Sequence, residues 1–166
     1  METWDAYNKS FQKIEGVTLY RGESIPRGMY HLVVDILVRH KDHTYLIMQR
    51  DYRKHYGGLW EATAGGSALK GESAFIAAKR ELKEETGISA FGLVEVGKEY
   101  SDDTQAIYVE YLVVVDINKD EVKLQENETI AYKWVSKDEL LELFDHNLIS
   151  KRMSKYIPEL RNEDID

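Results

Sequence analysis

The chain has 166 residues, 43% hydrophobic and 31% charged, and carries a formal net charge of −8 at pH 7. This length and composition predict one globular domain with a core that needs no disulfide or metal to hold it. The absence of cysteine excludes disulfides, zinc–thiolate sites and thiol nucleophiles, and the negative charge argues against a nucleic-acid polymer as the main partner.

No segment predicts a membrane span or a secretory signal. No run of 18 apolar residues occurs, and residues 1–13 are polar and of mixed charge, unlike a signal peptide. We therefore expect a cytoplasmic protein without a membrane partner, and the lack of cysteine suits a reducing compartment.

Strands are predicted first in chain order. Residues 17–20 form a short strand, and a turn containing Pro26 follows. Residues 32–39 are rich in β-branched side chains and are joined by a polar turn to residues 45–50, which predicts a hairpin. Further strands are predicted at residues 91–100, 106–117 and 131–135, with a charged loop at 118–128.

Helices are predicted at residues 72–86, after position 136, and at 151–161. The second begins with the capping-box spacing of Ser136 and Glu139. Interspersed strands and helices predict an α/β (α+β) fold with a mixed sheet between helices. We expect a single domain over residues 1–166, with an N-terminal extension (1–28), a core (29–148) and a C-terminal helical tail (149–166).

The helix at residues 72–86 carries the chemistry. Its predicted core-facing stripe consists of Ala74, Phe75, Ala78 and Leu82, which project within about 100° of one another. Glu85 projects between Ala74 and Ala78, Glu81 lies at the edge of the stripe, and Glu84 lies one step further round.

Three carboxylates on one side of a helix need compensation. Like charges at i,i+4 destabilise a helix by about 0.2–0.5 kcal/mol per pair, and desolvating an unpaired carboxylate costs more. Arg80 can offset Glu84 at i,i+4, and a hard divalent metal ion can offset the rest. A solvated charged face is the alternative for this run taken alone.

Residues 66–88 read GSALKGESAFIAAKRELKEETGI. This segment resembles the Nudix hydrolase signature at every defined position, which are Gly66, Glu72, Arg80, Glu81, Leu82, Glu84, Glu85, Gly87 and Ile88. The resemblance implies a Nudix-type α/β/α sandwich with a mixed β-sheet. It also implies that a diphosphate linkage in a nucleoside diphosphate joined to another moiety is hydrolysed with Mg²⁺ or Mn²⁺.

The resemblance also implies roles for individual residues. Glu81, Glu84 and Glu85 would hold the metal, and Glu84, Glu85 and Arg80 form the predicted catalytic set. Arg80 would orient a glutamate by a salt bridge, Glu72 would support the metal site, and Gly66 is assigned to substrate binding.

The base that accepts a proton from the attacking water has candidates in two parts of the chain. Glu85 is one candidate. Some family members use a glutamate in the loop before the last strand, and the candidates there are Glu126 and Glu128. The alternative for these two is a solvated acidic loop.

A second resemblance covers residues 31–50 and the basic residues that follow. This stretch looks like isopentenyl-diphosphate isomerases, in which a histidine at the position of His31 helps to bind metal. In those enzymes basic residues after the second strand hold the diphosphate, which here makes Arg50, Arg53 and Lys54 the substrate-binding candidates. A structural role for His31 is the alternative.

The chain departs from the isomerases at two places. Their catalytic cysteine precedes the position of Gly66, where this chain has Gly65, and the strand that carries their paired glutamates begins here with Gln105. We therefore predict a metal-dependent hydrolase of an isomerase-like subgroup lacking the isomerase cysteine. An isomerase-like enzyme and a non-catalytic nucleotide-binding Nudix module are the alternatives.

The expected partner is a small diphosphate-containing substrate. Substrate identity, the role of residues 1–28 and the oligomeric state, including a homodimer, stay open because specificity depends on loops outside the signature.

Overall fold

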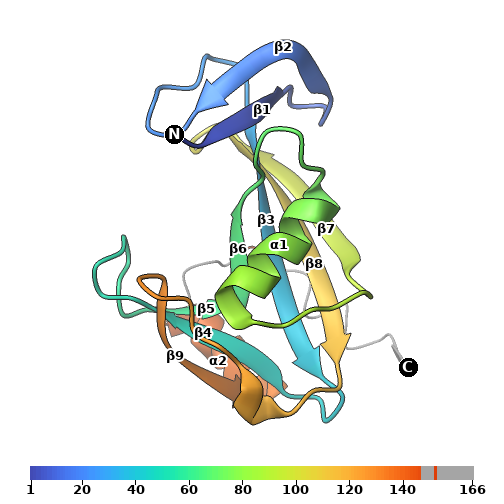
Figure 1. Ribbon diagram of the computed structural model, residues 1–166, viewed down its shortest axis with the longest axis vertical. Coiled ribbons are helices and arrows are strands. Elements are labelled where there is room, and N and C mark those ends of the chain that lie inside the picture. The colour runs from blue at the N-terminus through green and yellow to red at the C-terminus, as the bar shows by residue number, and fades with distance from the viewer. Residues whose placement is uncertain (147–151, 153–166) are drawn as a thin grey trace.

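The computed structural model describes residues 1–146 and residue 152. The predicted third helix, at residues 151–161, therefore lies outside the described residues except for position 152. In the part described, strands form a twisted sheet, one helix crosses each of its faces, and a hairpin at the N-terminus stands at one end (Figure 1).

A seven-stranded mixed sheet forms the centre of the fold. Its path is β5-β4-β3-β8-β7, with β6 paired to β3 and β9 paired to β4. The strands are β3 (His31–His40), β4 (Tyr45–Arg50), β5 (Trp60–Ala62), β6 (Ala64–Ser67), β7 (Val94–Ser101), β8 (Ala106–Val115) and β9 (Thr129–Val135).

The longest pairing joins β3 and β8 in parallel, from His31 beside Ala106 to His40 beside Val115, whereas the other strand pairs are antiparallel. The predicted hairpin is confirmed where Arg39 pairs with Tyr45. Beyond that pair β4 leaves β3 and joins β5 and β9.

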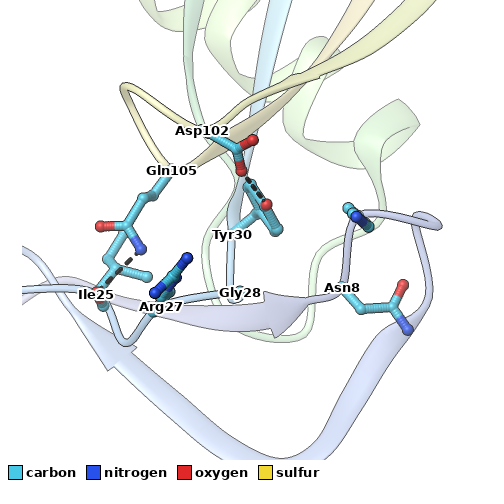
Figure 2. A pocket seen from close by; sticks show the side chains of 8 residues that line it. Asn8, Ile25, Arg27, Gly28, Tyr30, Asp102 and Gln105 are labelled. Atoms are coloured by element: carbon cyan, nitrogen blue, oxygen red, sulfur yellow. Dashed lines mark hydrogen bonds between the residues drawn. The ribbon is translucent and has the colours of Figure 1, made fainter.

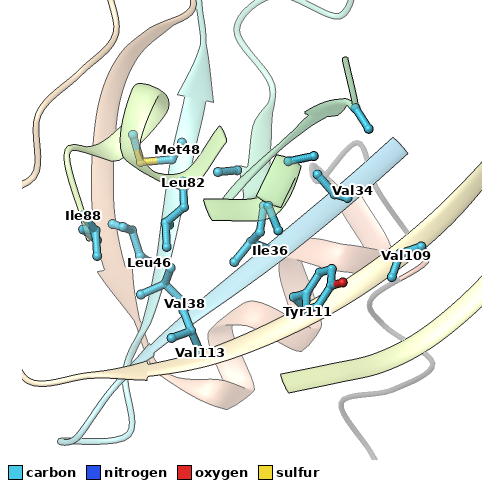
Figure 3. Packing of buried hydrophobic residues seen from close by; sticks show 14 of the residues in the cluster. Val34, Ile36, Val38, Leu46, Met48, Leu82, Ile88, Val109, Tyr111 and Val113 are labelled. Carbon is cyan, nitrogen blue, oxygen red and sulfur yellow. The ribbon is translucent and has the colours of Figure 1, made fainter. Parts of the chain in front are cut away.

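Because side chains alternate along a strand, the sheet has two buried faces, and each is covered by a helix. Helix α1 (Ala74–Thr86) buries Ala77, Ala78 and Leu82 against Val34, Ile36, Val38, Leu46 and Met48 (Figure 3). Helix α2 (Lys137–His146) buries Leu140 and Phe144 against Leu37, Tyr45 and Ile47. The predicted sandwich with a mixed sheet is confirmed.

The start and the buried face of α1 differ from the prediction. The helix begins at Ala74 with Ser73 as its N-cap, whose hydroxyl accepts a hydrogen bond from Ile76 N. Phe75 was assigned to the core stripe, which is wrong: it is 41% exposed, and Ala77 is fully buried. The buried arc is centred on Ala78 and Glu85, and Phe75, which projects within that arc, stands in the first turn of the helix and is left uncovered.

The N-terminal extension is a hairpin of β1 (Thr3–Tyr7) and β2 (Lys13–Tyr20), of which the sequence predicted only residues 17–20. It has a small core of its own, with Trp4, Ala6 and Leu19 buried. The hairpin is tied to the turn before α1, since Lys70 N donates to Thr3 O at 2.8 Å and Gly71 N donates to Asp5 at 2.7 Å.

The predicted loop at 118–128 contains one 3-10 turn, η1 (Lys119–Glu121). Across the described ranges, every helix is too short or too polar to cross a lipid bilayer.

Candidate active site

The candidate site forms where β6 approaches α1. Gly66 on β6 lies directly against the carboxylate of Glu81: a Cβ built on Gly66 would be 2.4 Å from Glu81 Oε1. Neighbouring Gly65 faces the other side of the sheet, where a Cβ would be 2.6 Å from Asp35 Oδ1. Two glycines in succession therefore let carboxylates approach the same strand closely from both faces.

Arg80 is the organising cation of the site. Its guanidinium donates to both oxygens of Glu72, at 2.8 and 2.9 Å, and to Glu81 Oε1 at 2.7 Å. It also reaches Glu84 at 3.3 Å and the carbonyl oxygen of Ser67 at 3.1 Å. The guanidinium group thus links the turn before α1 to the middle of the helix by hydrogen bonds. Arginine suits this role because its planar group carries several N–H donors.

Glu85 is the most buried carboxylate of the predicted set, at 9% exposure, as its projection between Ala74 and Ala78 indicated. Burial raises the pKa of Glu85 well above its ordinary value, and the neighbouring carboxylates of Glu61 and Glu81 raise it further. Burial is also the largest cause of the raised pKa of Glu81 and of Glu61. The three acids form a desolvated group that favours binding a proton or a cation.

A cavity of about 330 Å³ opens over these carboxylates. The residues that line it are Glu2, Arg21, Lys54, Gly65, Gly66, Ser67, Leu69, Arg80, Glu81, Glu84, Glu85, Gln125 and Glu128. Lys54 forms an ion pair with Glu128 across the cavity, and burial lowers the pKa of Lys54. The cavity therefore combines carboxylates with two arginines and one lysine, a mixed lining suited to a phosphate carried with a cation.

The donor set fits a hard divalent cation in its chemistry, because Glu81, Glu84 and Glu85 offer oxygen ligands beside a glycine that leaves room for them. Their positions are not yet those of a coordination shell: in the described ranges no three His, Asp or Glu side chains are assembled to hold a metal ion. Arg80 contacts Glu81 and Glu84, and Glu84 is 46% exposed.

The four predicted substrate-binding residues separate into two groups. Lys54 and Gly66 line the cavity. Arg50 does not line the cavity; it is paired with Glu61 and donates to the carbonyl oxygen of His55 at 3.0 Å. Arg53 is bound to Asp51 by two hydrogen bonds of 2.8 and 2.5 Å and does not line the cavity.

The two glutamates of the loop before β9 differ in their position relative to the cavity. Glu128 lies in the cavity wall beside Lys54, whereas Glu126 is exposed and is not part of the wall.

His31 is held by aromatic stacking. Its ring stacks on Trp4 with centroids 4.2 Å apart, and its Nδ1 lies 3.4 Å from Ser67 Oγ. Burial lowers the pKa of His31 to about 4. The neutral ring packs the N-terminal hairpin against β3, and it does not line the cavity.

Sequence reasoning missed several charged residues of the sheet. Glu61 stands among the buried acids, and Asp35 and Glu110 interrupt the apolar strands β3 and β8. A lone carboxylate within an apolar strand was the available signal, because burying such a group is costly without a partner.

A second cavity, of about 750 Å³, lies between the N-terminal hairpin and the β7–β8 turn (Figure 2). Tyr30 donates a short hydrogen bond to Asp102 there, and Gln105 Nε2 donates to the carbonyl oxygen of Ile25 at 3.0 Å. Lys9 and Arg27 at its rim are exposed. It contains none of the signature residues.

A family model and a curated relative assign the chain to the same family. The model of the NUDIX domain family matches residues 29–157. An uncharacterised Nudix hydrolase of Listeria monocytogenes is 32% identical over 142 residues, covering 84% of this chain and 83% of that protein.

Two other similar proteins support less specific conclusions. The isopentenyl-diphosphate Delta-isomerase of Serratia proteamaculans is 37% identical over only 65 residues, which is 39% of this chain and 36% of that protein. The crystal structure of DR0079 from Deinococcus radiodurans superposes with a TM-score of 0.75 over 95% of this chain and 98% of that one, at 17% identity. At that identity the likeness shows the fold.

Proposed function

Because this chain belongs to the Nudix family, we propose that it is a metal-dependent hydrolase of a diphosphate linkage, in a nucleoside diphosphate joined to another moiety or a similar small diphosphate. One observation carries the proposal: Gly66, Arg80, Glu81, Glu84 and Glu85 of the signature line a single cavity together with Lys54. A non-catalytic module would not need to keep every carboxylate of a desolvated, mutually repelling group.

The metal would be held by Glu81, Glu84 and Glu85. When bound, Mg²⁺ or Mn²⁺ would neutralise diphosphate oxygens, polarise phosphorus and lower the pKa of an attacking water. The chain's own residues complete the site. Arg80 fixes Glu81 and Glu72 in place, Lys54 supplies a positive charge toward the substrate, and the close approach at Gly66 keeps Glu81 against β6.

Glu85 is the proposed proton acceptor, because burial and the neighbouring carboxylates of Glu61 and Glu81 raise its pKa and so its affinity for a proton. Glu128 is the second candidate, because it lies in the same cavity within reach of Lys54. Glu126 points to solvent and is not proposed for this step.

Isomerisation is the second candidate function, and the partial match to an isomerase is what favours it. The position of the isomerase cysteine argues against it. At Gly65 any Cβ would be 2.6 Å from both the Val34 carbonyl oxygen and Asp35 Oδ1, so this backbone does not admit a side chain there. We therefore propose hydrolysis over isomerisation, and membership of an isomerase-like subgroup stays a proposal that rests on the partial match.

The test is a panel of small diphosphates incubated with Mg²⁺ and analysed by product mass. The expected result is cleavage of a diphosphate linkage that stops when the metal is chelated. Isopentenyl diphosphate is included in the panel and is expected to give no dimethylallyl diphosphate. If dimethylallyl diphosphate forms above a no-enzyme control and is lost in Glu84→Gln, the enzyme is an isomerase and the proposed hydrolysis is wrong.

Three variants assign the proton acceptor. Glu85→Gln and Glu128→Gln each remove one candidate carboxylate, and Glu126→Gln is the matched control in the same loop, outside the cavity. We expect Glu85→Gln to lose turnover and Glu126→Gln to keep it. Loss of turnover in Glu128→Gln alone, with metal binding intact by calorimetry, would move the base to the loop.

A further inference from the structure

Two carboxylates lie side by side on the face of the sheet that α1 does not cover. Asp35 on β3 and Glu110 on β8 are in-register neighbours on parallel strands, and both stand in otherwise apolar runs. Tyr108 lies two residues before Glu110 and so on the same face. Glu110 is fully buried.

The guanidinium of Arg152 occupies this place. Its Cζ lies 3.4 Å from the centroid of the Tyr108 ring. Its Nε donates to Glu110 Oε1 at 3.2 Å, and one terminal nitrogen donates to Asp35 Oδ2 at 3.0 Å. A planar group is thus stacked on an aromatic ring while two of its N–H groups donate to neighbouring carboxylates.

Arg152 does not satisfy every polar atom of the site. Among the described residues, Glu110 Oε2 is buried with no hydrogen-bond partner, although buried polar atoms are nearly always paired. Burial and the adjacent Asp35 raise the pKa of Glu110 to about 8 even with Arg152 in contact. One guanidinium therefore leaves the carboxylates incompletely compensated.

This site and the candidate active site share a strand. Gly65 presents its Cα to Asp35 on one side of β6, and Gly66 presents its Cα to Glu81 on the other. The Arg152 side chain is 29% exposed, so the site is open toward solvent.

We propose that Asp35, Glu110 and Tyr108 form a binding site for a planar group with paired N–H donors, and that Arg152 fills it in the free protein. Two kinds of compound carry this chemistry: a guanine ring, through N1–H and its 2-amino group, and a guanidinium compound. The inference rests on the proposed function in one respect, that the group recognised is a moiety of the diphosphate substrate. A ligand displaces Arg152 and takes over its stacking and its hydrogen bonds.

Binding is measured without divalent metal, using GMP and IMP, which differ only in the 2-amino group and contain no diphosphate. GMP is expected to bind at least about 10-fold more tightly than IMP, because a site built for paired donors rejects the analogue that lacks one. In Arg152→Gln, which removes the internal competitor, GMP affinity is expected to rise about 10-fold or more.

The guanidinium arm uses methylguanidinium and methylammonium on Arg152→Gln. Binding of methylguanidinium but not methylammonium, without a preference for GMP, would identify a guanidinium compound as the source of the group. Asp35→Asn is expected to abolish whichever preference is found, either for GMP over IMP or for methylguanidinium over methylammonium. Asp116→Asn, an exposed aspartate paired with Lys41, is the matched control and is expected to keep it.

A purely structural ion pair gives the opposite pattern. Arg152→Gln would then be folded but show no preference for GMP over IMP and none for methylguanidinium over methylammonium, and the proposal would be overturned. If Arg152→Gln does not fold, wild-type protein against Asp35→Asn decides the same question: a wild type with no preference for GMP over IMP and none for methylguanidinium over methylammonium overturns it. These measurements involve no hydrolysis, so their failure leaves the proposed enzyme function standing.

Discussion

Replacing Gly66 by alanine would place a methyl group against the carboxylate of Glu81. The new Cβ would lie 2.4 Å from Glu81 Oε1, and because ordinary contacts begin near 3.4 Å, the carboxylate must retreat by about 1 Å. The Gly66 backbone has a conformation open to any residue, so no strain arises from the main chain. The perturbation is therefore a displacement of one proposed metal ligand.

Stability and activity should respond differently. Gly→Ala at a compatible position stabilises by about 0.4–1 kcal/mol, and weakening the contact of Arg80 with Glu81 costs about 0.5–1.5 kcal/mol. The free energy of unfolding should thus change by less than about 1 kcal/mol. Turnover should fall about 10²-fold, because a misplacement of about 1 Å has that effect in a preorganised site.

The assay combines denaturant unfolding, Mn²⁺ titration by calorimetry and turnover on the substrate found in the panel. Gly92→Ala is the matched control, because nothing lies within 4 Å of its added Cβ, and it should leave all three measurements unchanged. Gly65→Ala should instead lose stability, since its Cβ meets the Val34 carbonyl oxygen at 2.6 Å and the main chain cannot yield. Wild-type metal affinity and turnover in a folded Gly66→Ala would refute the reasoning.

Three further predictions follow from single contacts. Glu85→Gln should leave the apo protein as stable as the wild type or more stable in urea, because a buried carboxylate among like charges is removed, while turnover falls about 10²-fold or more; near-normal turnover would exclude Glu85 from the mechanism. The pKa of Glu110 is raised to about 8 in the folded protein, so the folded state holds an extra proton between its ordinary pKa and 8. Stability should therefore fall as pH rises from 5 to 8, by at most about 1.4 kcal/mol per pH unit, and Glu110→Gln should flatten this part of the profile; identical slopes would contradict the assignment. Ser136→Ala should cost about 1 kcal/mol by thermal unfolding, since it removes the hydroxyl that accepts from Glu139 N at 3.2 Å at the start of α2 and keeps only the backbone bond to the Glu139 carboxylate; an unchanged melting temperature would show that the cap contributes nothing.

Local patterns in the sequence were enough for the family and much of the fold. The spacing of the signature, the capping box at Ser136 and the hairpin between β3 and β4 depend on residues close together in the chain. The burial of Glu85 followed from helical projection, because a helix has a fixed period. Phe75 shows the limit of that method: the period predicts which residues share a face, and the neighbouring elements decide which of them are covered.

The tertiary structure alone decided which distant residues meet. Lys54 and Glu128 come together across a cavity, while Arg53, one position from Lys54, is drawn to Asp51. Asp35 and Glu110 become neighbours only because β3 and β8 pair in parallel, 75 positions apart in the chain. No local periodicity encodes such pairings, because strand register results from the packing of the whole sheet. The sequence by itself thus determined which charged residues share a side of the signature helix, and the fold determined which other charges face them.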